Sequence, residues 1–182
     1  MRISGGSLRG RQVQVPQGLI RPAMDRMRES VFATLGDLEQ CPFLDMFSGS
    51  GIIALEAASR GASPIEAVEK DPLKWKTLIR NVAMAPVRIQ CRFMATEHYI
   101  RRARRSFGVI FCDPPFPYRF KGELVRAIAA SPLVRPGSRL LVHRPQEDPY
   151  IEGLGGVFSD EKVVLEESKR YGRSVVDFFV WR

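Results

Sequence analysis

The run Asp113-Pro114-Pro115-Phe116 combines residue types that suit the binding of a planar amine. Proline fixes φ and lacks an N–H, so the carbonyls of this run are held in place and free to accept hydrogen bonds. The carboxylate of Asp113 and the carbonyl of Pro114 can together accept the two hydrogens of an amino group, while Phe116 offers a flat surface for a base. The alternative is a proline-rich turn that merely ends a strand. The predicted catalytic residues are Asp113, Pro114, Pro115 and Phe116.

A second run, Leu44 to Gly51, is typical of a site for a nucleotide-like cofactor. Its glycines follow an apolar strand and lead directly into an expected helix, so the backbone can approach a ligand there. Glu69 ends the next expected strand, at the spacing of an acid that accepts hydrogen bonds from ribose hydroxyls. The predicted cofactor site comprises Asp45, Phe47, Ser48, Gly49, Ser50, Gly51, Glu69, Lys70, Asp71 and Asp113.

The glycine run has two other interpretations. Gly49 and Gly51 can simply form a turn from strand to helix, and the stretch 49–54 also satisfies the dinucleotide pattern G-x-G-x-x-[GA]. Asp45 argues against a dinucleotide, because an acid directly before the loop repels a pyrophosphate but attracts the ammonium of an amino-acid moiety. The order Asp-x-Phe-x-Gly-x-Gly also resembles the first motif of class I methyltransferases, which implies S-adenosylmethionine as the cofactor.

Together the two sites predict methyl transfer to an exocyclic base nitrogen. Such an amine is a poor nucleophile, because its lone pair is delocalised into the ring. Acceptors that hold both N–H bonds favour pyramidalisation and aim the lone pair at the sulfonium methyl, and Asp113 also assists loss of the proton. Positioning for in-line attack supplies most of the rate, since the sulfonium is already activated, and no metal is needed.

Strands that alternate with helices are expected to position both sites. Such alternation with short links predicts an α/β fold, with a parallel sheet covered by helices on both faces. Two β-rich runs near the end of the chain, joined by Lys169 to Gly172, predict a hairpin. Strands are expected at 43–47, 65–69, 87–93, 107–112, 138–142, 163–165 and 174–181, and helices at 25–35, 52–60, 71–83, 95–105 and 121–130.

The N-terminal segment is rich in arginine. Residues 1–28 hold six arginines against one acid, Asp25, within a net charge of +8. Clustered arginine indicates a polyanionic partner, because the guanidinium fork matches phosphate geometry. A second cluster at 101–105 fits a polyanion site and a solvated basic face equally well. The predicted RNA-binding residues are Arg9, Arg11, Arg21, Arg26 and Arg28.

Length and composition favour one catalytic domain at 25–182 with a small extension at 1–24, predicted as a β-hairpin. No apolar run is long enough to span a bilayer and the start lacks a signal-peptide core, so a cytoplasmic location is expected. The three cysteines are widely spaced and the two histidines are isolated in sequence, which argues against a metal site. A monomer is expected.

Nearly the whole chain resembles one family, the bacterial RsmD-type 16S rRNA guanine-N2 methyltransferases. Gly6 to Arg11 is similar to that family's G-x-x-[KR]-G-R element, and Gly18 to Glu29 to its R-P-T-x-D-x-x-[KR]-E segment. The two motifs described above and the final Lys169 to Gly172 match in order and spacing. The N-terminal elements discriminate most, because other methyltransferases share the remaining motifs.

The resemblance implies a doubly wound, Rossmann-like class I methyltransferase sheet of seven strands, the last two antiparallel. It also implies a guanine of 16S rRNA, in the 30S subunit or as free RNA, as the substrate. The N-terminal hairpin is expected to contact the RNA, and the segment from Arg21 to Glu29 to pack over the cofactor pocket.

The sequence departs from the family pattern at several places, among them Pro117-Tyr118, which make the loop after Phe116 more rigid and aromatic than the family pattern. The family's threonine is missing around Ala23 and Met24, and an acid expected near Arg144 is absent. The third expected strand ends without an acid, so adenine recognition is predicted to use backbone atoms near Met94 and Ala95.

Two rival functions remain open. A DNA methyltransferase acting on adenine N6 or cytosine N4 also uses an Asp-Pro-Pro-aromatic run, although this chain leaves little room for a domain that reads duplex sequence. A non-catalytic RNA-binding assembly factor with a methyltransferase fold is the rival from another class. The acids and glycines expected of both pockets favour an enzyme.

Overall fold

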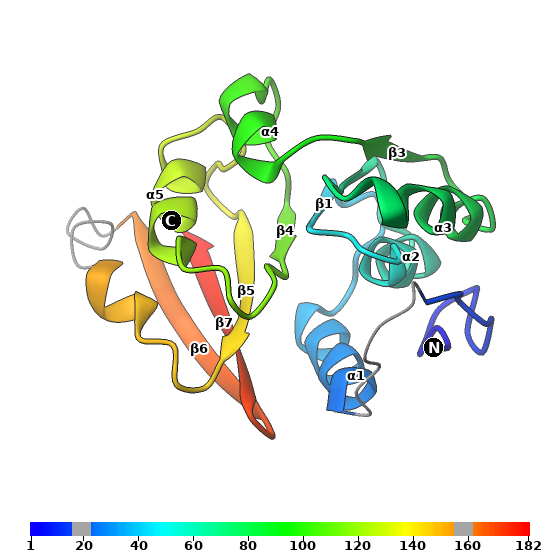
Figure 1. Ribbon diagram of the computed structural model, residues 1–182, viewed down its shortest axis with the longest axis horizontal. Coiled ribbons are helices and arrows are strands. Elements are labelled where there is room, and N and C mark those ends of the chain that lie inside the picture. Colours follow the sequence, from blue (N-terminus) through cyan, green and yellow to red (C-terminus); the bar gives the residue numbers. More distant parts are fainter. Residues whose placement is uncertain (16–22, 155–161) are drawn as a thin grey trace.

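The computed structural model describes residues 1–15, 23–154 and 162–182, and shows one seven-stranded sheet with helices on both sides (Figure 1). The strand order is β3-β2-β1-β4-β5-β7-β6. The strands are β1 Phe43–Met46, β2 Ile65–Val68, β3 Ile89–Arg92, β4 Val109–Cys112, β5 Arg139–Pro145, β6 Val163–Tyr171 and β7 Ser174–Trp181. The helices are α1 Ala23–Leu35, α2 Ile52–Ser59, α3 Pro72–Val82, α4 Thr96–Arg102 and α5 Lys121–Ala129, with a 3₁₀-helix η1 at Tyr150–Leu154.

The pairing of the strands confirms the predicted α/β topology. The first five strands run parallel, and β7 lies antiparallel between β5 and β6. The strand order reverses at β1, which has β2 on one side and β4 on the other. In doubly wound sheets ligands bind beyond the carboxyl ends of the strands at this reversal. The ends of β1, β2 and β4 are therefore the place to look for a site.

Alternation along the strands divides the apolar core into two layers. Side chains such as Phe43 and Phe111 pack in the layer with α1, α2 and α3, whereas neighbours such as Leu44 and Ile110 pack in the layer with α4, α5 and η1. Successive side chains of a strand point to opposite faces, so both faces of these short strands are apolar. Asp45 shares the face of Phe43 and so lies under α2.

The N-terminal segment is folded onto α2 (Figure 1). Ile3, Leu8 and Val13 are buried in the layer shared with α1, α2 and α3. A hairpin of two strands was expected, but residues 1–15 form a single antiparallel bridge between Arg2 and Gln12. The two arms still pair as in a short hairpin, since the N–H of Ile3 donates to the carbonyl of Arg11 and that of Val13 to the carbonyl of Met1. Between the arms the backbone bonds α2, where the N–H of Ser4 donates to Glu56.

Helix α4 and strand β6 differ most in length from the prediction. Helix α4 ends at Arg102 rather than near residue 105, because the chain turns extended at Ala103 and Arg105 pairs with Glu66. Strand β6 continues through the polar stretch 166–171, where only three apolar residues were expected to form a strand. Its residues are mostly exposed or half-buried, as in an edge strand, so the polar sequence conceals the strand signal. Among the described residues, no helix is long and apolar enough to cross a membrane.

Candidate active site

A cavity of about 1030 Å³ lies at the carboxyl ends of β1, β2 and β4. Pockets for small ligands typically enclose roughly 300–1,000 Å³, so there is room for a cofactor and part of a substrate together. The lining combines the two predicted sites with residues from α1, β5 and the β6–β7 turn. The lining residues are Met27, Phe47, Glu69, Lys70, Asp71, Pro72, Lys74, Asp113, Pro114, Pro115, Phe116, His143, Tyr171, Gly172, Arg173 and Ser174.

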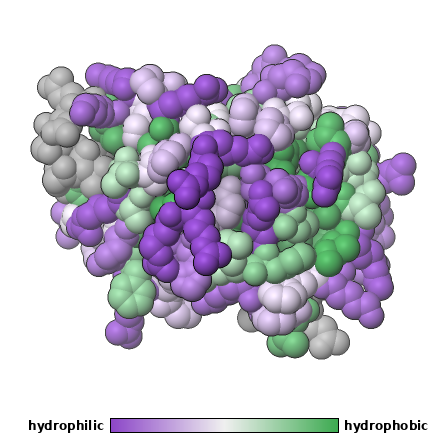
Figure 2. Space-filling view, turned by 90° about the horizontal axis from the view of Figure 1, so that it is seen from above, coloured by the Kyte–Doolittle hydropathy of each residue, from purple (hydrophilic) through white to green (hydrophobic). Residues whose placement is uncertain are grey.

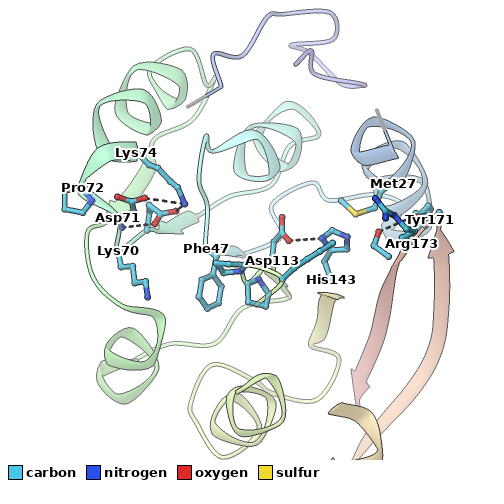
Figure 3. Close-up of a pocket in the computed structure, with 16 residues that line it drawn as sticks. Met27, Phe47, Lys70, Asp71, Pro72, Lys74, Asp113, His143, Tyr171 and Arg173 are labelled. Atoms are coloured by element: carbon cyan, nitrogen blue, oxygen red, sulfur yellow. Dashed lines mark hydrogen bonds and ion pairs between the residues drawn. The ribbon is translucent and has the colours of Figure 1, made fainter. Parts of the chain in front are cut away.

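Asp113 divides this cavity into two sides (Figure 3). On one side, called here the cofactor side, are Phe47 and the residues 69–74 that follow β2. On the other, called here the substrate side, are Met27, His143 and the β6–β7 turn at 171–174. A group held at Asp113 therefore faces both sides, which is the arrangement that transfer between two bound molecules requires.

Glu69 connects β2 to the glycine loop. Its buried carboxylate accepts the backbone N–H of Gly49 through Oε2 and that of Asp71 through Oε1, each at 2.8 Å. Gly51 has φ of 78°, and a Cβ there would lie 2.7 Å from Leu78, so glycine is required by both conformation and space. Glu69 is thus a rigid acid on the cavity wall, with the loop held behind it.

Asp45 is buried beneath the loop and does not line the cavity in the described structure. Its Oδ2 accepts the backbone N–H of Ala54, in the first turn of α2, at 3.2 Å. Burial raises the pKa of Asp45 well above its ordinary value, and the nearby carboxylates of Asp113 and Glu69 add to the rise, while the Ala54 N–H opposes it. A positive charge bound nearby favours the ionised form of this carboxyl.

Asp113 is held by both strands that flank β4. Its backbone N–H donates to the carbonyl of Met46 on β1 at 3.3 Å. Its Oδ1 lies 2.7 Å from Nδ1 of His143 on β5. In the parallel register Cys112 pairs with Val142, so Asp113 and His143 are the next residues along both strands. The carboxylate keeps 24% of its side-chain surface exposed and borders the cavity.

His143 is a site residue that the sequence prediction missed, because the two histidines were judged by their spacing along the chain. A signal was present: each of two apolar strand runs is followed at once by a polar residue, Asp113 in one case and His143 in the other. Using that signal requires knowing that β4 and β5 are neighbours in register, which the spacing along the chain does not show.

The loop after Asp113 is fixed at several points. The ring of Phe116 meets that of His143 edge-on, with centroids 5.5 Å apart. The buried ammonium of Lys121 donates to the carbonyl of Tyr118 at 2.5 Å and pairs with Asp148 at 2.7 Å. These contacts fix the loop that follows Asp113 in the absence of a ligand.

Tyr118, in the same loop, contacts residues on the cofactor side. Its hydroxyl donates to Glu97 at 2.7 Å, and its ring meets Phe47 edge-on at 5.5 Å. Burial alone would raise the pKa of Glu97, but the hydrogen bond from Tyr118 helps to bring that pKa below its ordinary value. The loop and the exit of β1 are therefore joined on this side of the cavity.

On the substrate side, hydrogen bonds join two elements that are far apart in the sequence, α1 and the β6–β7 hairpin. The hydroxyl of Tyr171 donates to Oγ of Ser30 on α1 at 2.7 Å, and Nζ of Lys169 donates to Thr34 at 2.6 Å. These bonds tie the β6–β7 hairpin to α1, so that Met27 and Tyr171 both border the cavity. Met27 comes from the segment for which the family resemblance implies a place over the pocket.

The remaining predicted cofactor residues lie outside the cavity lining. Ser48, Gly49, Ser50 and Gly51 lie in the loop behind Glu69, and the hydroxyl of Ser48 donates to the carbonyl of Asp45. Met94 borders a second cavity of about 530 Å³ around Glu66, and Ala95 precedes α4. Their contact with a cofactor stays a prediction.

The predicted RNA-binding arginines fall into three groups. Arg9, Arg11 and Arg26 are exposed, and Arg21 lies outside the described residues. Arg28 is a correction to the prediction, since its side chain is 2% exposed. Its guanidinium bonds Asp25, Glu56 and the carbonyl of Arg2, so it joins α1 to the N-terminal segment and has no surface left for RNA.

The second arginine cluster lies on and just after α4. The face seen in Figure 2 is mostly hydrophilic. Arg101, Arg102, Arg104 and Arg105 are all exposed, and Arg105 also pairs with the buried Glu66 at 2.9 Å. One of the four arginines therefore serves an internal ion pair, and the other three remain available to solvent or to a partner.

Arg144, near which the family pattern predicts an acid, belongs to an internal network. Its Nε lies 2.6 Å from Oδ2 of Asp177, a buried carboxylate that also accepts the hydroxyls of Tyr150 and Ser168. Arg144 therefore fastens β5 to β7 and is absent from the cavity lining. Among the described residues, no group of three or more His, Cys, Asp or Glu side chains is arranged to hold a metal ion.

Comparison with known proteins places these features in a family. The family model described as "Conserved hypothetical protein 95" matches residues 1–180. The Ribosomal RNA small subunit methyltransferase D of Escherichia coli (strain K12) is 35% identical over 122 residues, which cover 64% of this chain and 60% of that protein. The match thus spans less than two thirds of that relative's length. The protein of the same name from Haemophilus influenzae is 28% identical over 163 residues, covering 83% of this chain and 82% of its own.

Solved structures agree with the family match. The Escherichia coli protein yhhF has a TM-score of 0.84 and 26% identity, covering 100% of this chain and 98% of its own. A hypothetical protein from a Thermus species has a TM-score of 0.79 and 30% identity, covering 98% of both chains. The sheet is therefore the Rossmann-like sheet of class I methyltransferases, and the chain belongs to the family described as Conserved hypothetical protein 95, that of the RsmD-type methyltransferases.

Proposed function

We propose that the protein transfers the methyl group of S-adenosylmethionine to the exocyclic N2 of a guanine in 16S ribosomal RNA. The observation that carries this proposal is the position of Asp113, clamped between β1 and β5 at the boundary of the two sides of one cavity. The names of the family's relatives, which are small-subunit ribosomal RNA methyltransferases, support RNA as the substrate class.

The cofactor side suits an adenosine linked to an amino acid. Glu69 presents a buried carboxylate to ribose hydroxyls, and Lys70 and Asp71 border the same region. Asp45, beneath the glycine loop, favours a bound ammonium, which would relieve the cost of its buried charge. Adenine would rest near the backbone of Met94 and Ala95. When bound, S-adenosylmethionine supplies an activated methyl group, and one methyltransferase with the same fold was solved in complex with the related SAH.

Asp113 and the target loop act on the amine. The carboxylate of Asp113 and the carbonyl of Pro114 accept the two N–H bonds of the amine, while Phe116 stacks on the base. S-adenosylmethionine would supply the methyl group to the nitrogen, and Asp113 would accept the proton that the nitrogen releases and pass it to solvent. The chain supplies orientation and a proton acceptor, which suits a reaction whose electrophile is already activated.

The substrate test compares three acceptors with labelled cofactor: unmethylated 30S particles, naked 16S RNA and duplex DNA. The expected result is label in one or both RNA substrates, recovered after digestion as N2-methylguanosine, and none with Asp113→Ala. Label on DNA adenine or cytosine without label on RNA would overturn the proposal, as would full activity of Asp113→Ala. Cofactor binding without methyl transfer to any acceptor would favour the assembly-factor alternative.

The exposed N-terminal arginines provide a second test of the RNA assignment. The pair Arg9→Ala and Arg11→Ala is expected to weaken RNA binding and to lower the slope of log affinity against log salt by about 1–2, because each phosphate contact releases a counterion. The matched control is Arg101→Ala with Arg102→Ala on α4, which removes the same charge. A larger loss in the α4 pair would place the RNA on that face instead.

A further inference from the structure

The contact between His143 and Asp113 joins two strand ends at the centre of the cavity. Nδ1 of His143 lies 2.7 Å from Oδ1 of Asp113, a distance typical of a strong hydrogen bond to a charged acceptor. The imidazole is 4% exposed and the carboxylate 24% exposed, so the ring is almost fully covered while it borders the cavity beside the carboxylate. Nothing in the family motifs assigns a role to this histidine.

The chemistry of the two groups decides which ring nitrogen carries the proton. An ionised carboxylate only accepts hydrogen bonds, so the contact requires the proton on Nδ1 of His143. In the neutral ring Nε2 is then a bare acceptor. Nε2 is buried and has no hydrogen-bond partner among the described residues. The ring therefore makes a hydrogen bond through Nδ1 to Asp113, whereas its Nε2 makes none among the described residues.

Stability alone does not explain a histidine at this position. A buried acceptor without a partner costs free energy, whereas an apolar side chain of similar size would pack there without that cost. Val142 before it and Val176, its partner on β7, are apolar and buried. What the imidazole adds over an apolar residue is the Nδ1–H bond to Asp113 and the edge contact with Phe116.

We propose that His143 is a positioning residue for the reaction. Its Nδ1–H occupies Oδ1 of Asp113 and thereby turns Oδ2 toward the amine of the substrate. Among the described residues, Oδ2 of Asp113 accepts no hydrogen bond, so this oxygen can accept one from a substrate in the cavity. The same ring bears on Phe116, so one imidazole orients both the acceptor and the stacking surface. The inference rests on the proposed methyl transfer at Asp113.

The test uses two substitutions that differ in one property. His143→Asn keeps an N–H donor on the γ-carbon, close to the position of Nδ1, while His143→Leu fills a similar space without a donor. The expected result is a kcat about 10–100-fold lower for His143→Leu, since small misplacement of a reacting group has effects of this size, and within about threefold of wild type for His143→Asn. Cofactor affinity by calorimetry should be unchanged in both, and the melting temperature of His143→Leu should not fall.

Two kinetic outcomes would overturn the proposal. One is a wild-type kcat in His143→Leu. The other is an equal loss of activity in both variants together with a lower melting temperature, which is the signature of a purely structural residue.

A second measurement does not depend on activity. The ¹⁵N spectrum of the histidine rings should show the proton on Nδ1 of His143 in the wild type, and Asp113→Ala should abolish that preference. A proton on Nε2 in the wild type would overturn the inference whatever the enzyme methylates. If the tautomer is as expected but no RNA acceptor is methylated, the proposed function has failed while the contact stands.

Discussion

The two sides of the cavity are built in different ways. The cofactor side comes from Phe47 at the end of β1 and from residues 69–74 after the neighbouring strand β2, with the glycine loop behind Glu69. The substrate side comes from α1, β5 and the β6–β7 turn, which lie far apart along the chain and meet through bonds such as Tyr171 to Ser30. The cofactor side is formed by short sequence motifs that can be recognised locally. The substrate side forms only when the whole sheet has assembled.

The two sides also hold their polar groups differently. On the cofactor side Glu69 and Asp45 accept hydrogen bonds from backbone N–H groups, so these acids are fixed by main-chain geometry. Asp113 at the boundary and Tyr171 on the substrate side instead depend on other side chains, His143 and Ser30. Changes on the cofactor side should therefore alter cofactor affinity, and changes on the substrate side should alter turnover or RNA affinity. Four substitutions test this division.

The largest effect on activity is expected at Asp113, on the boundary between the two sides of the cavity. Asp113→Asn is predicted to lower kcat by about 10²–10⁴-fold, because the amide cannot serve as the proton acceptor. Cofactor affinity should change by less than about threefold, since Asp113 acts on the amine. Single-turnover kinetics and calorimetry measure the two quantities separately. Glu147→Gln, an exposed acid elsewhere, is the control. A large loss of cofactor affinity with normal turnover would place Asp113 on the cofactor side.

The next effect is expected at Glu69. Glu69→Gln removes the charge that is aimed at the ribose hydroxyls and weakens the anchor of Gly49, so cofactor affinity should fall by about 10–100-fold, in line with hydrogen bonds to charged groups of roughly 1.5–3 kcal/mol. Saturating cofactor should restore most of kcat. Glu166→Gln on the exposed face of β6 provides the matched control. Loss of turnover that cofactor cannot restore would contradict the assignment.

A smaller effect with a definite pH dependence is expected at Asp45. Its pKa is raised by burial in the folded protein, so the folded state binds more protons than the unfolded state, whose Asp has a pKa of about 3.9. Stability is therefore lost as pH rises from that unfolded value through the folded pKa. Asp45→Asn should melt a few degrees higher than wild type at neutral pH, with the difference vanishing below the unfolded pKa.

The same variant should bind the cofactor several-fold more weakly at neutral pH, because it no longer attracts the ammonium. Thermal melts across a pH series and calorimetry check the two parts. An Asp45→Asn protein that is less stable than wild type at every pH would mean that the buried carboxylate is fully compensated in the free protein.

The smallest effect is expected at Tyr171. Tyr171→Phe removes the hydroxyl that bonds Ser30 and keeps the ring, so α1 and the β6–β7 hairpin lose one tie of about 1 kcal/mol. KM for RNA should rise by about threefold or less, with cofactor affinity unchanged. Ser30→Ala should reproduce the change, and the double variant should add little. A change in cofactor affinity instead would show that the two sides are not separable.

The order of the elements and both motifs of the site were predictable because they follow from local rules. Apolar runs followed by Gly49 and Gly51, or by Asp113 and two prolines, mark strand ends in a parallel sheet. The polar edge strand β6 and the short N-terminal bridge were not predicted well. In β6 the pairing with β7 extends the strand through a polar stretch whose sequence does not indicate one. At the N-terminus the hairpin is shorter than predicted, because the backbone N–H of Ser4 bonds Glu56 of α2.

The arginines show the same limit. Arg9 and Arg28 look alike in the sequence, yet one is exposed and the other is buried among Asp25 and Glu56. Charge can be counted along a chain, but whether a guanidinium faces solvent depends on which acids the fold brings to it. The burial of Arg28 follows from the packing of α1 on α2 and the N-terminal segment.

The sequence by itself determined the class of fold, the family and the two acids, Asp113 and Glu69, that end strands at the site. These features depend on periodicity and short motifs, which are properties of neighbouring residues. Only the tertiary structure decided that His143 lies against Asp113 and that α1 and the β6–β7 turn close the substrate side. Those contacts depend on strand order and register, because residues distant in the chain meet only when β4, β5 and β7 lie side by side.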